Sequence, residues 1–328
     1  MEFKKLAMAA MAASMAVCGA VGFSFAQAPK HGVEIVVGAS PGGGDDATAR
    51  AVEAAFNAAK LVGQPLNVNY RPGAGGTVAV AYINNYRGDM HYLNIAALNL
   101  ITNHLQGTSP LGPADVTPLA ALYTEYLCFA AHPKGKLQTA KDLIEALKKD
   151  ASALRFGFGT AAGNHNQIAF AALAEKIGID PKKPRTVIFP GAADATSQLL
   201  GQHVDFVVAP ARQFASYHKA GELKCLAVTA PERFKGDLAD VPTLTELGYD
   251  VTAGSWRIMI APGGVKGPEL AFWEDAFKKM MDVEAWKVQA EKNYWSVNYR
   301  NHEDTLKFLE AESKQAASAL KALGLLKN

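Results

Sequence analysis

The sequence has little cysteine and no excess of charge of either sign. Three cysteines in 328 residues are too few for a disulfide scaffold. Lysine and arginine number 33 against 31 aspartate and glutamate residues, so the formal net charge is only +2. Nucleic-acid-binding proteins concentrate basic residues, and this balance therefore argues against a nucleic-acid partner. The hydrophobic share of 49% instead fits one large or two medium globular domains.

Metal-binding and catalytic patterns are also missing. None of the eight histidines forms an H-x-x-x-H pair, and no C-x-x-C occurs. The phosphate-binding pattern G-x-x-x-x-G-K-[ST] is absent, and no Ser–His–Asp set can be assembled from the sequence. We therefore expect no metal, no cofactor and no catalytic residue.

A long apolar run occurs only at the amino terminus. Two lysines precede it, and it ends in the small-residue pattern Ala26-Gln27-Ala28. This order is typical of a secretory signal peptide, and we expect residues 1–28 to be removed by cleavage near Ala28. The alternative is a retained membrane anchor. Cleavage leaves 300 residues with a net charge of +1 (31 basic and 30 acidic residues) in an exported protein.

Strand-like and helical segments alternate through the rest of the chain. Short apolar runs predict strands at 33–37, 66–68, 93–97, 127–131, 156–159, 186–189, 206–208, 225–228 and 258–260. Between them, one helix is expected to begin at Asp45 and Asp46 and to end at Gly63, and another to be capped by Thr139 with Asp142. This alternation predicts an α/β protein with two doubly wound sheets.

The absence of a flexible linker suggests that strands join the two parts of the chain. We expect 127–131 and 225–228 to be hinge strands between two lobes. Lobe 1 then comprises residues 29–129 and 228–328, and lobe 2 comprises residues 130–227. Cys128 and Cys225 fall in these two strands, and the interpretation as two buried free thiols is preferred over a disulfide.

Two glycine-rich clusters each lie between an expected strand and an expected helix, at 38–44 and 71–76. In open α/β sheets the ligand crevice lies outside the carboxyl ends of the strands. Glycine also lets backbone N–H groups approach a small anion closely. A third loop of small residues, 157–164, adds to this pattern. We expect a cleft that binds an anion through backbone amides rather than through cationic side chains.

Other interpretations of these segments are weaker. Residues 38–42 match the G-x-S-x-G of a hydrolase with Ser40 as nucleophile, which would make the protein a secreted serine esterase. Pro41, however, has no N–H to donate to an oxyanion hole. A tight turn without a ligand is the structural alternative for either cluster. Trp256 and Arg257 are expected to lie in the core, with the arginine stacked or paired, and a contact of this pair with the ligand is the alternative.

The order and spacing of several short motifs resemble the periplasmic solute-binding proteins of tripartite tricarboxylate transporters, the Bug or TctC family. These motifs are PGGxxDxxAR at 41–50, RPGAGG at 71–76, DVTPLA at 115–120, FPG at 189–191, LGQHVD at 200–205, AGxLK at 220–224, LAVT at 226–229, DVPTL at 240–244 and GSW at 254–256. The resemblance covers essentially the whole chain after the signal peptide.

The resemblance implies a two-lobe periplasmic binding protein (type II, Venus flytrap) with a carboxylate between its lobes. The first lobe is expected to hold the carboxylate with Ser40, Pro41, Gly42, Gly43, Asp46, Gly73, Ala74 and Gly75. The variable part of the ligand is expected to face Tyr70, Thr160, Ala161, Asn164, His165, Phe189, Gly191 and Asp205. For Asp46, helix capping is an equally good interpretation. Asp205 would disfavour a second carboxylate nearby, or pair with a ligand amine or hydroxyl.

Several positions depart from the pattern of the family, and they concern the pocket more than the scaffold. Tyr70 stands where the family usually has asparagine, and Gln167 where a histidine is common. Residues 89–92 replace the usual Asp-Gly-Tyr-Thr, and the third loop lacks its customary serines. The identity of the carboxylate therefore stays open.

The resemblance also implies partners and a place of action. A monomeric, non-enzymatic receptor is expected in the periplasm, where it delivers a small organic carboxylate to the permease subunits of a tripartite transporter. A sensor subunit that presents the same ligand to a membrane signalling receptor is the alternative, because both roles need closing lobes.

Overall fold

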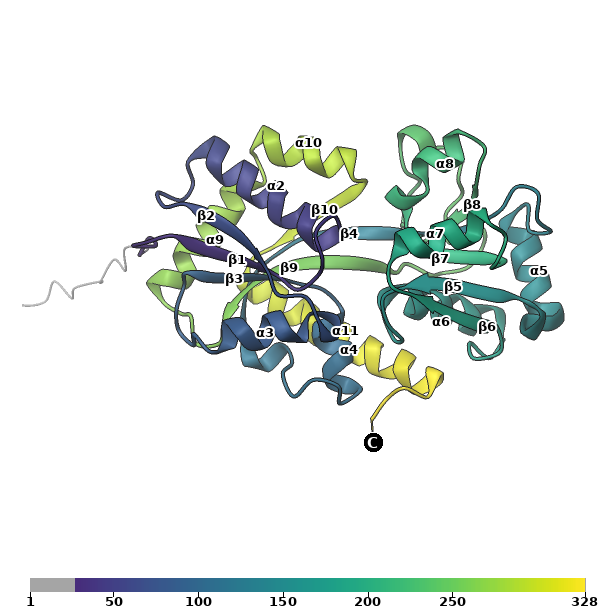
Figure 1. Cartoon of the computed structure of the whole chain (residues 1–328), viewed down its shortest axis with the longest axis horizontal. Helices are drawn as coiled ribbons and strands as arrows, with labels where there is room; N and C mark the ends of the chain where they lie inside the picture. The colour runs from purple at the N-terminus through teal and green to yellow at the C-terminus, as the bar shows by residue number, and fades with distance from the viewer. Residues whose placement is uncertain (1–26, 328) are drawn as a thin grey trace, which may run out of the picture.

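The computed structural model describes residues 27–327. The predicted signal peptide, residues 1–28, therefore lies outside the described residues except for its last two positions. Two α/β lobes stand side by side and share one long strand (Figure 1). This arrangement confirms the predicted two-lobe class, with helices on both faces of each sheet.

The first lobe is built on a mixed sheet with the strand order β2-β1-β3-β9-β4-β10. Its strands are β1 (Val33–Val37), β2 (Leu66–Tyr70), β3 (Tyr92–Ala96), the first part of β4 (Val116–Ala131), β9 (Gly254–Pro262) and β10 (Trp295–Arg300). One face is covered by α2 (Gly44–Ala59), α9 (Pro268–Met280) and α10 (Glu284–Lys292). The other face is covered by α3 (Thr77–Asn84), α4 (Asn99–Leu105) and α11 (His302–Leu323). The strands β1, β2 and β3 are parallel, so the loops that follow them meet at one edge.

The second lobe has the strand order β6-β5-β7-β4-β8. Its own strands are β5 (Arg155–Gly159), β6 (Arg185–Phe189), β7 (Phe206–Pro210) and β8 (Lys224–Val228). The helices are α5 (Ala140–Asp150) and α6 (His165–Ile177) on one face, and α7 (Ala192–Leu200) and α8 (Ala215–Lys219) on the other. Short 3₁₀ turns span Ala74–Gly76, Pro113–Asp115, Ala151–Ala153, Ala211–Gln213 and Gly236–Leu238. The parallel strands β5, β6 and β7 again bring their following loops to one edge.

The crossings between the lobes differ in part from the expected ones. The strand β4 crosses as expected, since its first part pairs with β9 and residues 127–131 pair with β7 and β8. The strand β8 does not cross. The chain after it stays on the second lobe, where Leu238, Val241, Leu244 and Val251 enter the two cores. We therefore propose that the second boundary lies near Ala253 rather than at residue 228.

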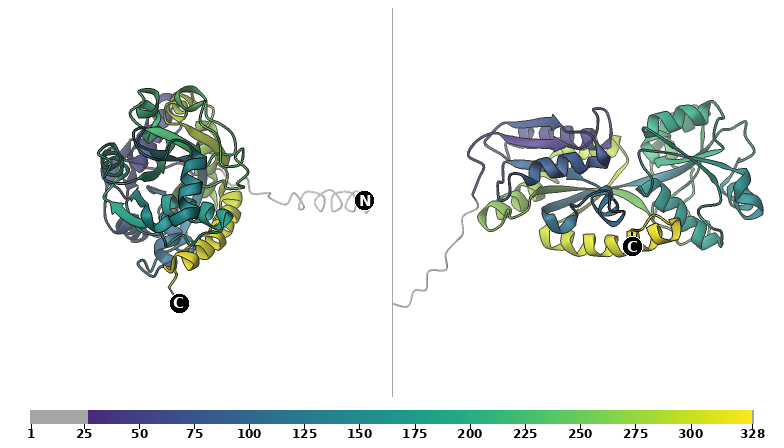
Figure 2. Two further views of the ribbon diagram at one scale, coloured as in Figure 1. Left: turned by 90° about the vertical axis from the view of Figure 1, so that its right-hand side faces the viewer. Right: turned by 60° about the horizontal axis from the view of Figure 1, so that its bottom comes forward.

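Most predicted elements are present, with shifted ends. The strand at Val33–Val37 has the predicted bounds, and Thr139 forms the predicted capping box with Asp142 at the start of α5. The helix α2 ends earlier than Gly63, because Lys60 takes the left-handed conformation that closes it. The long helix α11 ends at Gly324 and extends along the first lobe toward the second (Figure 2).

The two cysteines of the described chain form a disulfide, so the preference for free thiols was wrong. Cys128 lies in β4 and Cys225 in the neighbouring β8, and their Cα atoms are 5.9 Å apart. This separation is within the range that a disulfide spans. Although 97 residues separate the two cysteines along the chain, the pairing of β4 with β8 brings them together.

Candidate functional site

The first glycine loop leads directly into α2. Gly43 is the N-cap of this helix, and no side chain caps its first turn. The Gly42 N–H donates to the Asp46 carboxylate at 2.7 Å, so Asp46 ties the loop to the helix. Ser40, Pro41 and Gly42 are exposed. The amide groups of the first turn of a helix attract anions, and here they stand at the expected edge of the sheet.

The second loop follows β2 and lies against the first. Gly73, Ala74, Gly75 and Gly76 all have positive φ, a conformation that glycine adopts readily and alanine rarely. A Cβ on Gly38 would lie 2.9 Å from the Cα of Gly76. The two loops are therefore so close together that only glycine fits at position 38.

Asparagine side chains of α4 hold the second loop by its carbonyl groups. Asn99 donates to the Gly75 oxygen at 2.7 Å, and Asn103 donates to the oxygens of Ala74 and Gly75 at 3.1 and 3.2 Å. Between the two loops lies a cavity of about 20 Å³, which has room for about one water molecule. The wall of the cavity combines polar groups, among them Asp45 and Asn94, with aliphatic side chains of β3 and α4.

Tyr70 supports the first loop through Asp46. Its hydroxyl donates to Asp46 at 2.6 Å and accepts from Arg50 at 2.9 Å. Burial alone would raise the pKa of Asp46, but the Tyr70 hydroxyl, the Gly42 N–H and Arg50 together lower it below its usual value. Asp46 therefore carries a negative charge that is already satisfied within the protein. It lies in the first turn of α2 and binds the preceding loop, whereas the N-cap position is occupied by Gly43.

The third loop, after β5, contacts the loop after β6 through a backbone hydrogen bond and a close approach of two glycines. Asn164 caps α6 and donates to the Gly159 oxygen and the Thr160 hydroxyl. Thr160 has a φ of 81°, and its N–H donates to the Phe189 oxygen at 2.8 Å. A Cβ on Gly159 would lie 2.4 Å from the carbonyl carbon of Gly191. The predicted residues Thr160, Asn164, Phe189 and Gly191 thus come together, and Ala161 is exposed beside them.

His165 occupies the first position of α6, and its Nδ1 is buried without a hydrogen-bond partner. Burial, together with the positive charge of Arg257, lowers the pKa of this imidazole to about 3. The ring lines one end of a groove of about 910 Å³ that runs between α6 and α11. His165 therefore faces the junction of the lobes as a neutral group.

Asp205 lies away from the other predicted residues. It precedes β7 and binds Arg155, the first residue of β5, with 2.9 Å between Oδ1 and Nη2 and 2.7 Å between Oδ2 and the backbone nitrogen. Asp205 thus lies at the amino-terminal ends of β5 and β7. The loops that contain Thr160 and Arg212 instead follow the carboxyl-terminal ends of these strands. Burial would raise the pKa of Asp205, but Arg155 outweighs it and lowers that pKa. The structure thus gives Asp205 a partner within its own lobe.

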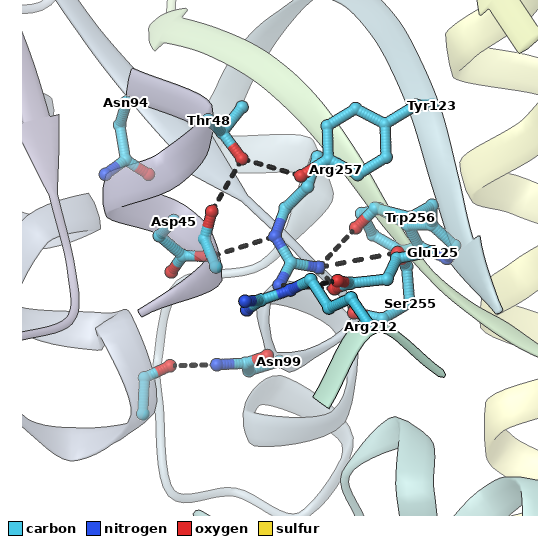
Figure 3. Close-up of polar contacts among 12 residues, drawn as sticks. Asp45, Thr48, Asn94, Asn99, Tyr123, Glu125, Arg212, Ser255, Trp256 and Arg257 are labelled. Atoms are coloured by element: carbon cyan, nitrogen blue, oxygen red, sulfur yellow. Dashed lines mark hydrogen bonds and ion pairs between the residues drawn. The ribbon is translucent and has the colours of Figure 1, made fainter. Parts of the chain in front are cut away.

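Four charged residues that were not among the predicted site residues meet at the start of α2 (Figure 3). Arg257 of β9 is 6% exposed and pairs with Asp45, with 2.9 Å between Nε and Oδ1. Burial alone would lower the pKa of Arg257, but Asp45, Tyr123 and Glu125 raise it. Arg212 follows β7 and pairs with Glu125 of β4, with 2.5 Å between Nε and Oε1.

The facing loop edges of the two lobes are already in contact. The Gln106 side chain of the first lobe donates to the Ala162 oxygen of the second at 3.3 Å. A Cβ on Gly163 would meet Gln106 at 2.3 Å and Leu320 of α11 at 2.8 Å. Together with the Glu125–Arg212 pair, these contacts place the glycine loops of both lobes around one region.

Two further features concern residues 27–327 only. Within this range, no group of three histidine, cysteine, aspartate or glutamate side chains is placed to hold a metal ion. No helix of the same range is long and apolar enough to cross a membrane.

Comparison with known proteins identifies the family of the chain. The sequence model of the tripartite tricarboxylate transporter family receptor matches residues 49–325. The chain belongs to this receptor family. A relative from Cupriavidus necator, described as a UPF0065 protein in the gbd 5′ region, is 28% identical over 332 residues, which cover 98% of each chain. A crystal structure of a TctC solute-binding protein from Polaromonas is 26% identical, covers 92% of this chain and 100% of its own, and gives a TM-score of 0.73.

Two structures from Rhodopseudomonas palustris share the fold at 22% identity. MatC with bound malate covers 89% of this chain and 99% of its own, with a TM-score of 0.74. A second protein, with adipate, covers 90% and 98%, with a TM-score of 0.79. Members of the receptor family are solute-binding proteins and not enzymes, which argues against Ser40 as the nucleophile of an esterase.

Proposed function

We propose that this receptor is exported to the periplasm, closes around a small organic carboxylate and delivers it to the membrane permease of a tripartite tricarboxylate transporter. The observation that carries the proposal is the pair of interlocked glycine loops at the uncapped start of α2, opposite the third loop of the other lobe. Exposed amide donors at a helix start suit a carboxylate. The two family-fold structures that contain malate and adipate support the same class of ligand.

A second line of support comes from the two-lobe architecture. The lobes are connected through β4 and the chain near Ala253, so a bend there would change the distance between the loop edges without unfolding either core. Closing lobes would bury the ligand and present a distinct surface to a permease.

A thermal-shift screen of the mature protein against mono-, di- and tricarboxylates tests the ligand class. Malate and adipate are the first compounds to examine. A ligand at 100 times its Kd stabilises the folded state by about 2.7 kcal/mol, which raises the melting temperature measurably. If no carboxylate raises it while a solute of another class does, the proposed ligand class is wrong.

Export is tested separately, because the leader lies outside the described residues. After expression of the full chain, amino-terminal sequencing of the periplasmic fraction should begin at Pro29. A protein that stays in the membrane fraction with its first residues intact would contradict cleavage and favour the retained anchor.

Delivery to the permease needs its own experiment. Deletion of the cognate permease should abolish uptake of the carboxylate identified in the screen.

A further inference from the structure

Two guanidinium groups from different lobes converge at the first residue of α2. The Nη2 atom of Arg257 lies 2.8 Å from the position that a Cβ on Gly44 would take. The Nη2 atom of Arg212 lies 3.7 Å from the same position. Arg257 comes from β9 of the first lobe, whereas Arg212 follows β7 of the second. One small anion at this helix start can therefore reach both guanidinium groups.

The protein holds the Nε and Nη1 atoms of Arg257 and the Nε atom of Arg212. Arg257 binds Asp45 through Nε, and its Nη1 donates to Ser255 and to the Trp256 oxygen. Arg212 binds Glu125 through Nε. By contrast, within residues 27–327 neither Nη2 atom donates a hydrogen bond. The donors nearest to the start of α2 are thus the ones left available, and that of Arg257 belongs to a side chain 93% buried.

Glu125 links the two arginines. Its Oε1 binds Arg212, while its Oε2 is buried without a hydrogen bond and lies 4.0 Å from the Nη2 of Arg257. Asp45, Arg257, Glu125 and Arg212 therefore form a chain of alternating charges from α2 through β9 and β4 to the second lobe (Figure 3). With two cations and two anions, the chain is neutral before a ligand enters.

This arrangement favours the binding of an anion at one place. Two positive groups close to the positive end of a helix repel one another and attract a negative charge. A guanidinium group also matches the planar geometry of a carboxylate. Asp45 and the Oε1 of Glu125 are engaged with the Nε atoms of Arg257 and Arg212, and the Oε2 of Glu125 lies 4.0 Å from the Nη2 of Arg257, beyond hydrogen-bond distance.

We propose that Arg212 is the ligand-binding residue of the second lobe and that it joins the lobes through the ligand. The ligand carboxylate lies at the first turn of α2 and accepts hydrogen bonds from the Nη2 groups of Arg212 and Arg257. Glu125 is a positioning residue that orients Arg212 without touching the ligand. This assignment rests on the proposed function, since it names the contact by which a carboxylate receptor closes.

Affinity measurements on variants test the assignment. Wild type, Arg212→Ala, Arg212→Lys and Arg233→Ala are screened by thermal shift and titration calorimetry against the same mono-, di- and tricarboxylates. Arg233 is the matched control, because it pairs with Glu246 on the exposed surface of the same lobe. Arg212→Ala should weaken binding by tenfold or more and Arg212→Lys by less, whereas Arg233→Ala should bind as wild type does.

Gly44→Ala provides a second test that leaves all four charges in place. Its methyl group would meet the Nη2 of Arg257 and occupy the anion position, so affinity should again fall at least tenfold. Gly63→Ala is its control, because a Cβ at Gly63 has no atom within 4 Å. This pair keeps the assignment falsifiable if Arg212→Ala folds poorly.

A readout of lobe closure separates ligand binding from a merely structural role. Dyes placed on the two lobes should approach one another when wild type binds the carboxylate, and higher ligand concentrations should be needed in Arg212→Ala. If Arg212→Ala and Gly44→Ala bind and close as wild type does, the assignment is overturned while the carboxylate receptor stands. If no carboxylate binds wild type, the proposed function fails and the assignment fails with it.

Discussion

Arg212 of the second lobe and Glu125 of the first are joined by an ion pair, with 2.5 Å between Nε and Oε1. The Glu125 side chain is 2% exposed and that of Arg212 is 24% exposed. The carboxylate of this pair is therefore buried next to the hinge, whereas its cation is still partly exposed to solvent. Glu125 also lies 4.0 Å from the Nη2 of Arg257, which belongs to the first lobe. Glu125 therefore compensates positive charge from both lobes.

Glu125→Gln should destabilise the ligand-free protein. Glutamine keeps the size of the side chain but leaves Arg212 and the buried Arg257 with one negative charge fewer. Removal of one partner from a buried ion pair costs about 3 kcal/mol. Urea denaturation of wild type and variant at pH 7 measures the loss. Glu246→Gln is the control: its pair with Arg233 is exposed, and about 1 kcal/mol or less is expected. Equal losses in both variants would contradict the buried role of Glu125.

Asp205→Asn should lower stability and leave carboxylate affinity unchanged. Arg155 lowers the pKa of Asp205 although burial alone would raise it, so the ionised form stabilises the fold. The stabilisation is full above the unfolded-state pKa near 4 and is lost as the pH falls through the lower folded-state pKa. We expect a loss of about 1 kcal/mol at pH 7 and a smaller difference at pH 3. Weaker carboxylate binding by this variant, at equal folding, would restore Asp205 to the site.

The elements that the sequence predicted well are those with a local signal. The strand at Val33–Val37 is β-branched and bounded by turn residues, and its bounds are as expected. The first half of β4 was missed because Pro118 and the polar pair Thr124 and Glu125 interrupt its apolar run. The strand β10 was missed because an edge strand that is only partly buried lacks a continuous apolar pattern.

The same distinction explains the site. Glycine clusters such as 71–76 are visible in the sequence, because positive φ angles and close loop contacts demand glycine. The arginine pair is not visible, since Glu125, Arg212 and Arg257 are far apart in the chain and meet only where β4, β7 and β9 come together. Arg257 was correctly expected to be buried and paired, but nothing local to it indicates the approach of Arg212. The proposed contacts of Arg212 and Arg257 with the ligand would add cationic side chains to a site that the sequence predicted to bind through backbone amides alone.

The mature protein should contain no free thiol. Cys128 and Cys225 form a disulfide, and Cys18 lies within the predicted leader. Thiol titration in denaturant should give zero groups before reduction and two afterwards, whereas free cysteines would give two at once. Because the disulfide closes a loop of about 97 residues, its removal in Cys128→Ala/Cys225→Ala should cost about 2–5 kcal/mol. Denaturation of wild type with and without a reductant provides the comparison.

His165→Gln should make stability less dependent on pH between pH 7 and pH 5. Burial and the charge of Arg257 lower the pKa of His165 to about 3 in the folded protein, whereas an unfolded histidine titrates near pH 6.5. As the pH falls below 6.5, the unfolded state binds a proton that the folded state does not, so the wild type loses up to about 2 kcal/mol by pH 5. Glutamine has no such proton and should remove this part of the loss. The measurement is urea denaturation at both pH values, with the exposed His203→Gln as control. If His165→Gln and wild type lose equal stability on acidification, the imidazole is not held neutral beside Arg257.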